Sequence, residues 1–252
     1  DAPITGDSGP IDAGGDAALP DSLWVYYRFD GDVHDFSGNG RDGTLGGATA
    51  TLDAGGKIGT ALSCASPGDK VKIGDDFHPG SSSFTVALFY RLALKADGGA
   101  VNVFNSMLVK GSAWEDSTND TPGFGIGYND GAQQLSGFIR DDVSTHTWVA
   151  VHAKASSSLT IRDATFHHAA LVVDRDSSSP RVSFYVDGKI TDFVAVPAGY
   201  GPIDSPEIAQ LGSEGTVNNP AIQLHGALDE VMIFTRALGA AEIADLAART
   251  HD

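Results

Sequence analysis

The sequence contains little of what several large classes of protein depend on. Cys64 is the only cysteine among 252 residues, which excludes an internal disulfide and a zinc site built from cysteines. No apolar segment approaches the roughly 20 residues of a membrane-spanning helix. Basic residues are scarce, because 16 Lys and Arg face 33 Asp and Glu, giving a net charge of −17. We therefore expect no nucleic-acid partner and no membrane insertion.

What the chain does contain suits a β protein rich in turns. Hydrophobic residues make up 41% of the sequence, which is enough for a sizeable core, and there are 31 glycines. The acidic residues are mostly Asp, which favours turns and metal-binding loops. Residues 1–22 are rich in Asp, Ala, Gly and Pro and have almost nothing to bury, so we predict a low-complexity tail or linker. Residues 23–252 are then one folded domain.

From residue 23 onward, short β segments alternate with Gly, Asp, Asn and Ser. In one of them, Phe84, Val86, Leu88 and Tyr90 share a face, and Asp187-Gly188 predicts a tight hairpin turn. The expected strands lie near Leu23–Phe29, Ala61–Cys64, Lys70–Ile73, Phe84–Leu94, Ser106–Lys110, Gly123–Tyr128, Leu135–Asp141, His146–Ala153, Thr165–Asp174, Arg181–Val186, Lys189–Ala195, Glu207–Gly212 and Gly226–Thr235.

One helix is expected, from about Gly239, with Leu238, Ile243 and Leu246 as its buried stripe and Glu242 in its first turn. Strands throughout with a single helix near the C-terminus predict an all-β, two-sheet antiparallel sandwich.

The loop between Tyr27 and Leu45 is crowded with Asp, Asn and Gly. Asp30, Asp35 and Asn39 fall within it, among several glycines that let the backbone turn sharply. Carboxylate and carbonyl oxygens are the ligands that Ca²⁺ prefers, and clustered carboxylates repel one another without a cation. The alternative is an Asx-rich turn that holds no metal.

Four segments, in order, resemble laminin-G-like modules of the concanavalin A-like lectin/glucanase superfamily. They are Y-Y-R-F-D-G-D-V-H-D-F-S-G-N-G-R-D-G-T-L; I-G-T-A-L-S-C-A-S-P-G-D-K-V-K-I with S-F-T-V-A-L-F-Y-R; F-H-H-A-A-L-V-V-D-R-D with R-V-S-F-Y-V-D-G-K; and L-H-G-A-L-D-E-V-M-I-F-T-R-A-L-G-A-A-E-I. The resemblance spans about Leu23 to Ala248 and implies a jelly-roll fold.

The resemblance also implies a structural Ca²⁺ that joins the first loop to the last long strand. The matching positions here are Asp30, Asp35, Asn39, the backbone near Gly43, and Asp229. A cation shared by both segments would fasten the two ends of the sandwich. The alternative for Asp229 and its neighbour Glu230 is a turn cap or an ion pair with Arg236.

The superfamily includes glycosidases and lyases as well as lectins, so an enzyme that degrades polysaccharide is a further alternative. The E-x-D-x-E string of its glucanases is absent, although hydrolysis needs two positioned carboxyl groups. A lyase-like set could be made from Tyr128, Gln134, Arg140 and His146, but the strand motifs of those lyases are missing. His167 and His168 are expected on opposite faces of a strand, one packed and one exposed. We therefore expect a non-enzyme.

The favoured function is a lectin-like module that binds a polysaccharide or a glycoprotein glycan. Sugar rings stack on aromatic faces, and planar polar groups bond their hydroxyls. Trp114 is the expected platform, unless it anchors its long loop, whereas Trp24 and Trp148 are expected in the core. The predicted sugar-binding residues are Trp114, Tyr128, Asn129, Asp130 and Tyr200.

The competing reading is a structural or adhesive surface protein that binds no sugar and self-associates through the N-terminal tail. Such a tail could add a strand to the sheet edge of a neighbouring copy, although Pro3, Pro10 and Gly14-Gly15 would interrupt the pairing. Both readings place the protein outside the cell or on its surface.

Overall fold

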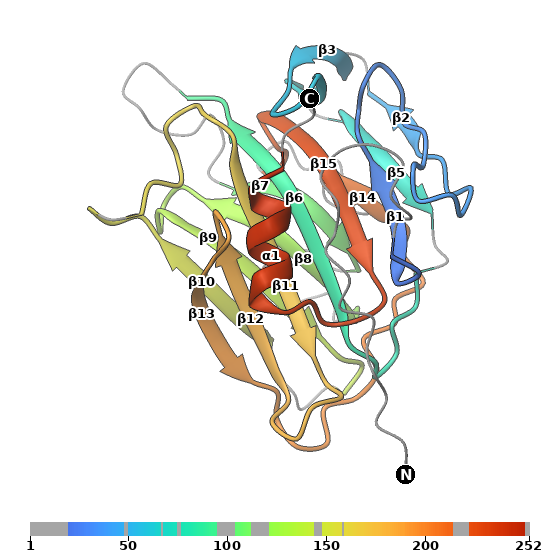
Figure 1. The fold of residues 1–252 in the computed structure, drawn as a ribbon, viewed down its shortest axis with the longest axis vertical. Coiled ribbons are helices and arrows are strands. Elements are labelled where there is room, and N and C mark those ends of the chain that lie inside the picture. Colours follow the sequence, from blue (N-terminus) through green and yellow to red (C-terminus); the bar gives the residue numbers. More distant parts are fainter. Residues whose placement is uncertain are drawn as a thin grey trace.

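Two antiparallel β-sheets packed face to face form the body of the protein, as the computed structural model shows (Figure 1). The structure describes residues 20–47, 50–66, 68–74, 77–94, 104–111, 121–143, 148–157, 159–213 and 222–249. The predicted tail lies almost wholly outside these ranges, so its role in self-association stays a prediction. Within the same ranges, no helix has the length and apolarity needed to cross a bilayer.

The first sheet contains the longest strands and the pairing that joins the two ends of the fold. β1 (Leu23–Tyr27) pairs with β15 (Gly226–Phe234), which lies beside the central strand β6 (Phe84–Leu92). The remaining strands of this sheet are β3 (Thr51–Gly55), β4 (Thr60–Cys64), β11 (His167–Asp174), β12 (Arg181–Val186) and β13 (Lys189–Ala195), and the path runs β13-β12-β11-β6-β15-β4-β3.

The second sheet runs in the order β10-β9-β8-β7-β14-β5-β2. Its strands are β2 (Thr44–Gly46), β5 (Lys70–Gly74), β7 (Phe104–Lys110), β8 (Gly123–Asn129), β9 (Gln134–Arg140), β10 (Val149–Lys154) and β14 (Ala209–Leu211). Inward residues of both sheets alternate along the strands, as Phe84, Val86, Leu88 and Tyr90 do in β6, and together they form the main core.

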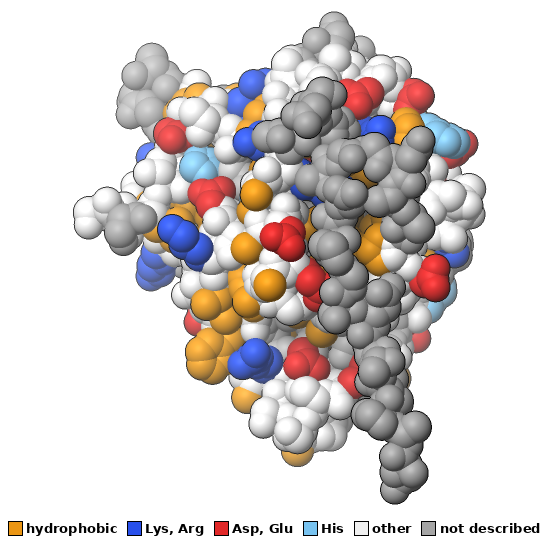
Figure 2. Space-filling model, in the orientation of Figure 1, with side chains coloured by type: hydrophobic (Ala, Val, Ile, Leu, Met, Phe, Trp, Pro, Cys, Tyr) orange, Lys and Arg blue, Asp and Glu red, His pale blue; other side chains and the backbone are white. Residues whose placement is uncertain are grey.

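A second, smaller core lies on the outer face of the first sheet, beneath α1 (Ala240–Ala247). Ile243 and Leu246 of the helix pack there against Tyr26, Tyr185 and Met232. The helix begins after Gly239, whose N–H donates to Glu242 at 2.7 Å. Figure 1 shows α1 in front of the sandwich with β7 to β10 behind, and Figure 2 shows that same face, with apolar side chains gathered over β13.

The all-β sandwich and the helix are confirmed, and most predicted strands match within a few residues. The Asp187-Gly188 turn is confirmed, since both residues have positive φ, at 48° and 76°. His167 and His168 face opposite sides of β11, as expected, but both are buried, so the expectation that one of them is exposed was wrong. The predictions missed β2 and β3, which are short, rich in Thr and Gly, and lie at the ends of their sheets.

Candidate functional site

A hollow of about 230 Å³ opens on the outer face of the second sheet, over β7, β8, β9 and β10. This is the sheet face that α1 does not cover (Figure 1). Small-molecule pockets in proteins commonly enclose roughly 300–1,000 Å³. The hollow is smaller than that, so it has room for a single ring with the rest of a ligand outside.

The hollow exists because β8 presents almost no side chains outward. Its sequence G-F-G-I-G-Y-N sends Phe124, Ile126 and Tyr128 into the core and leaves glycines on the outer face. A Cβ added to Gly125 would lie 2.8 Å from a ring carbon of Phe138. Glycine therefore lets the Phe138 ring lie directly over the backbone of the neighbouring strand.

Aromatic rings form one wall of the hollow. Trp148, just before β10, meets Phe138 edge to face, with ring centroids 4.6 Å apart and an interplanar angle of 70°. The Arg140 guanidinium lies 5.1 Å from the Trp148 ring centroid. Trp148 is half-buried and lines the hollow, so the prediction that it belongs to the core was wrong, whereas Trp24 is 7% exposed and lies in the core as predicted.

A hydrogen-bonded polar cluster forms a second wall, further along the same two strands. His152 Nδ1 lies 2.8 Å from Ser136 Oγ and 3.2 Å from Gln134 Nε2. The Gln134 amide nitrogen can only donate, so Nδ1 accepts and the neutral ring carries its proton on Nε2. Burial lowers the pKa of His152 below its ordinary value, with Lys154 acting the same way and Asp192 opposing them. The ring is therefore a neutral donor at pH 7.

The described residues that line the hollow include no charged side chain. The described residues that line it include Asn105, Ser106, Asn129, Gln134 and Ser136, but no Asp, Glu, Lys or Arg. This is notable in a chain with a net charge of −17. Neutral donors and acceptors beside exposed aromatic surface suit an uncharged ligand that carries several hydroxyl groups.

The predicted sugar-binding residues are only partly brought together. Asn129 and Tyr128 line the hollow, but the Tyr128 ring belongs to the core and its hydroxyl accepts from Arg162 at 3.2 Å. Asp130, in the turn between β8 and β9, forms an ion pair with Arg162 of the loop between β10 and β11. Tyr200 is 6% exposed and donates to the Ile139 carbonyl at 3.0 Å, so the structure places it in the core.

Trp114 falls in residues 112–120, outside the described residues, and its role as a platform stays a prediction. Of the lyase-like set, Gln134 and Arg140 share the outer side of β9, and Tyr128 faces inward, although Tyr128 and Gln134 both line the hollow. His146 lies outside the described ranges. Sequence reasoning missed Phe138, Trp148, Ser136 and His152, although alternation along β9 and β10 places them all on one face.

The residues predicted to hold calcium fall into two hydrogen-bonded groups. Asp35 accepts the Tyr26 N–H at 3.1 Å, the Ser37 N–H at 2.9 Å and the Arg41 N–H at 2.9 Å. Burial acts to raise the pKa of Asp35, but these bonds hold it below the ordinary value. Nearby, Asn39 Nδ2 donates to the Leu23 carbonyl at 2.9 Å.

The other group holds the turn between β3 and β4. Asp229 accepts the Ile58 N–H and Asp30 accepts the Thr60 N–H, each at 3.0 Å. Burial raises the pKa of Asp229 to about 7. Gly43 belongs to neither group, and its N–H donates to the Val33 carbonyl at 2.7 Å within the first loop.

Backbone N–H donors thus occupy these carboxylates, and no three His, Cys, Asp or Glu side chains of the described residues are grouped to hold a metal. The arrangement does not fit a calcium cage. Calcium stays a prediction, which a melting scan with and without chelator would test.

The two antiparallel sheets define a β-sandwich module. A family model described as the concanavalin A-like lectin/glucanases superfamily, Laminin_G_3, matches residues 65–244. The chain belongs to this family. No curated protein matches the chain.

Solved structures give the same fold. The binding domain of Paraclostridial Mosquitocidal Protein 1 aligns with a TM-score of 0.69 at 15% identity, covering 90% of this chain and 52% of that one. Domain 4 of AbnA, a GH43 extracellular arabinanase from Geobacillus stearothermophilus solved with arabinotriose, gives 0.60 at 20%, covering 90% and 98%. The binding domain of botulinum neurotoxin DC, solved with SialylT, gives 0.64 at 14%, covering 90% and 51%.

This chain therefore spans about half the length of the two toxin binding domains. At these identities the likeness establishes the fold.

Proposed function

We propose that the protein is a non-catalytic carbohydrate-binding module that holds one uncharged sugar ring in the hollow over β7 to β10. The observation that carries the proposal is that the half-buried Trp148 ring lines the same hollow as the neutral polar wall of Gln134, Ser136 and His152. Sugar rings present apolar C–H faces and hydroxyl edges, and such a site offers a surface to each.

Two similar structures support a carbohydrate as the ligand class, because they were solved in complex with arabinotriose and SialylT. The small volume of the hollow favours one unit of a longer polysaccharide or glycoprotein glycan. A ligand of that kind is consistent with an extracellular or cell-surface location, which is part of the proposal.

The test is binding to an array of neutral and acidic glycans, followed by titration calorimetry with the best ligand. We expect Trp148→Ala to weaken binding at least tenfold, which is about 1.4 kcal/mol, with little change in the melting midpoint. Phe193→Ala is the matched control, because Phe193 is 60% exposed on β13, in the other sheet. The proposal fails if no glycan binds, or if both variants bind as the unmodified protein does.

A further inference from the structure

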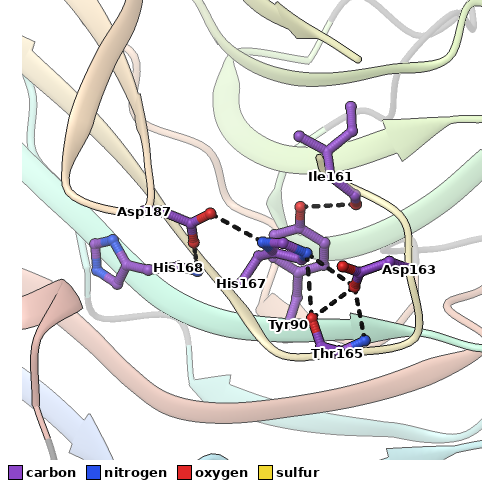
Figure 3. A network of polar contacts seen from close by, with 7 residues as sticks. All are labelled: Tyr90, Ile161, Asp163, Thr165, His167, His168 and Asp187. Carbon is purple, nitrogen blue, oxygen red and sulfur yellow. Dashed lines mark hydrogen bonds and ion pairs between the residues drawn. The ribbon is translucent and has the colours of Figure 1, made fainter. Parts of the chain in front are cut away.

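His167, the first residue of β11, lies between two carboxylates (Figure 3). Its Nδ1 is 2.9 Å from Asp187 Oδ2, and its Nε2 is 3.1 Å from Asp163 Oδ1. A neutral imidazole has one N–H, so both contacts are hydrogen bonds only when both nitrogens are protonated. The hydrogen bond with Asp187 and the charge of both carboxylates raise the pKa of His167, against the opposing effect of burial.

Two titratable groups that neighbour His167, Tyr90 and His168, are neutral at pH 7. Tyr90 of β6 stacks near it, with ring centroids 5.8 Å apart, and burial raises the pKa of its hydroxyl well above the ordinary value. His168 points to the opposite face, where burial lowers its pKa to about 4. The cluster is therefore one imidazolium between two carboxylates, at the meeting point of β6, β11 and two loops.

The two carboxylates are not held equally. Asp187 also accepts the His168 N–H at 2.9 Å, so the backbone of β11 fixes it independently of the ring. Asp163 lies in the loop between β10 and β11, and its other hydrogen bonds among the described residues are with Thr165 of the same loop. If His167 loses a proton, the bond to Asp163 is the one that gives way.

The loop that carries Asp163 also braces the rim of the hollow. Its Ile161 carbonyl accepts the Tyr90 hydroxyl at 3.0 Å, and the next residue, Arg162, reaches the Tyr128 hydroxyl at 3.2 Å and pairs with Asp130. Arg162 therefore lies between Ile161, which bonds to Tyr90, and Asp163, which bonds to His167. Through Asp130 it holds the turn that joins β8 to β9.

That turn positions two polar residues of the hollow. Asn129 precedes it and accepts the Ala132 N–H at 3.0 Å, while Gln134 follows it. The carbonyl of Gln133 accepts the Ala155 N–H at 3.2 Å, which ties the turn to the same loop. A continuous set of contacts therefore runs from His167 to the polar wall.

We propose that His167 is a positioning residue whose protonated ring keeps the hollow in its binding shape, so that ligand affinity falls at alkaline pH. The binding part of this inference rests on the proposed function. Because the folded pKa of His167 is raised, its stabilising contribution is complete below the unfolded value of about 6.5. It is lost as the pH rises through the folded pKa, and Asp163 then releases the loop.

The brace itself is tested without any ligand. Imidazole NMR of the full chain reports the protonation of His167, and amide exchange gives protection factors for residues 159–166 between pH 6.5 and 9.5. We expect both nitrogens to be protonated at pH 6.5, and the loop protection to fall several-fold as the ring titrates. A neutral His167 at pH 6.5, or unchanged protection through its titration, would overturn the inference.

The coupling to the hollow is tested with the best glycan from the array. We expect the unmodified protein to lose affinity about three- to tenfold over the same pH range, a loss of about 0.7–1.4 kcal/mol. Asp163→Asn should bind weakly already at pH 6.5 and show a flat profile, whereas Asp245→Asn, on the exposed side of α1, should behave as the unmodified protein does.

A pH-independent affinity alongside falling loop protection would refute the coupling. If no glycan binds at any pH, the proposed function fails. The NMR and exchange data then still decide whether protonated His167 holds the loop through Asp163.

Discussion

The outer faces of the two sheets differ in one respect that separates packing from recognition. Outward residues of the first sheet, such as Tyr26, Tyr185 and Met232, are apolar and lie beneath α1. Those of the second sheet include Gly125, Ser136 and His152 beside aromatic rings, and no helix of the described residues covers them. An apolar face requires a cover, whereas glycine next to polar and aromatic residues leaves a usable hollow.

The largest effect is expected from weakening the packing of α1 on the outer face of the first sheet. Ile243 is fully buried between α1 and the first sheet. We expect Ile243→Ala to lower the free energy of unfolding by about 2–5 kcal/mol, measured by urea denaturation, without changing glycan affinity. Ala241→Ser, on the exposed side of the helix, is the control. A loss below about 0.5 kcal/mol would show that α1 contributes little to stability.

Filling the hollow is the converse change. Ala150 lies on the outward side of β10, is only partly buried and lines the hollow. We expect Ala150→Trp to reduce glycan affinity more than tenfold, about 1.4 kcal/mol, because the larger side chain occupies the space of the ligand. The unfolding midpoint should stay nearly constant, since the inward residues of the strand are untouched. Undiminished binding would place the ligand elsewhere.

The smallest expected effect concerns the acidic limit of binding. Burial keeps the pKa of His152 below its ordinary value, so the ring stays neutral at pH 7 and gains a proton only below about 6.5. Protonated Nδ1 cannot accept from Ser136 or Gln134, and the polar wall rearranges. We expect affinity to fall a few-fold between pH 7 and pH 4.5, and His152→Gln to remove this dependence. If His152→Gln loses as much glycan affinity at acidic pH as the unmodified protein does, another group causes the effect.

The sequence predicted the fold well because each local pattern agreed with the final structure. The alternation in β6, the Asp187-Gly188 turn and the helix from Gly239 all depend on neighbours within a few residues. The hollow was harder to predict. Alternation separates Trp148 and His152 from Val149 and Val151, but it does not say which outer face remains uncovered.

Long-range pairings were outside the reach of sequence reasoning. Asp163 and Asp187 meet the ring of His167 only because the loop after β10 and the turn after β12 arrive at one end of β11. The predicted calcium residues also depend on long-range placement, since Asp35 accepts the Tyr26 N–H and Asp229 accepts the Ile58 N–H. Neither the acidic pattern of the loop nor the family resemblance predicted which backbone amides these carboxylates bind.

The placement of the hollow on alternating outward positions has an evolutionary consequence. Its walls come from strands whose inward residues, such as Ile126, Ile139 and Val151, are fully buried in the main core. Substitutions on one side of each strand can change what is recognised while the other side preserves stability. Related chains could therefore diverge in ligand preference rapidly, with few compensating changes in the interior.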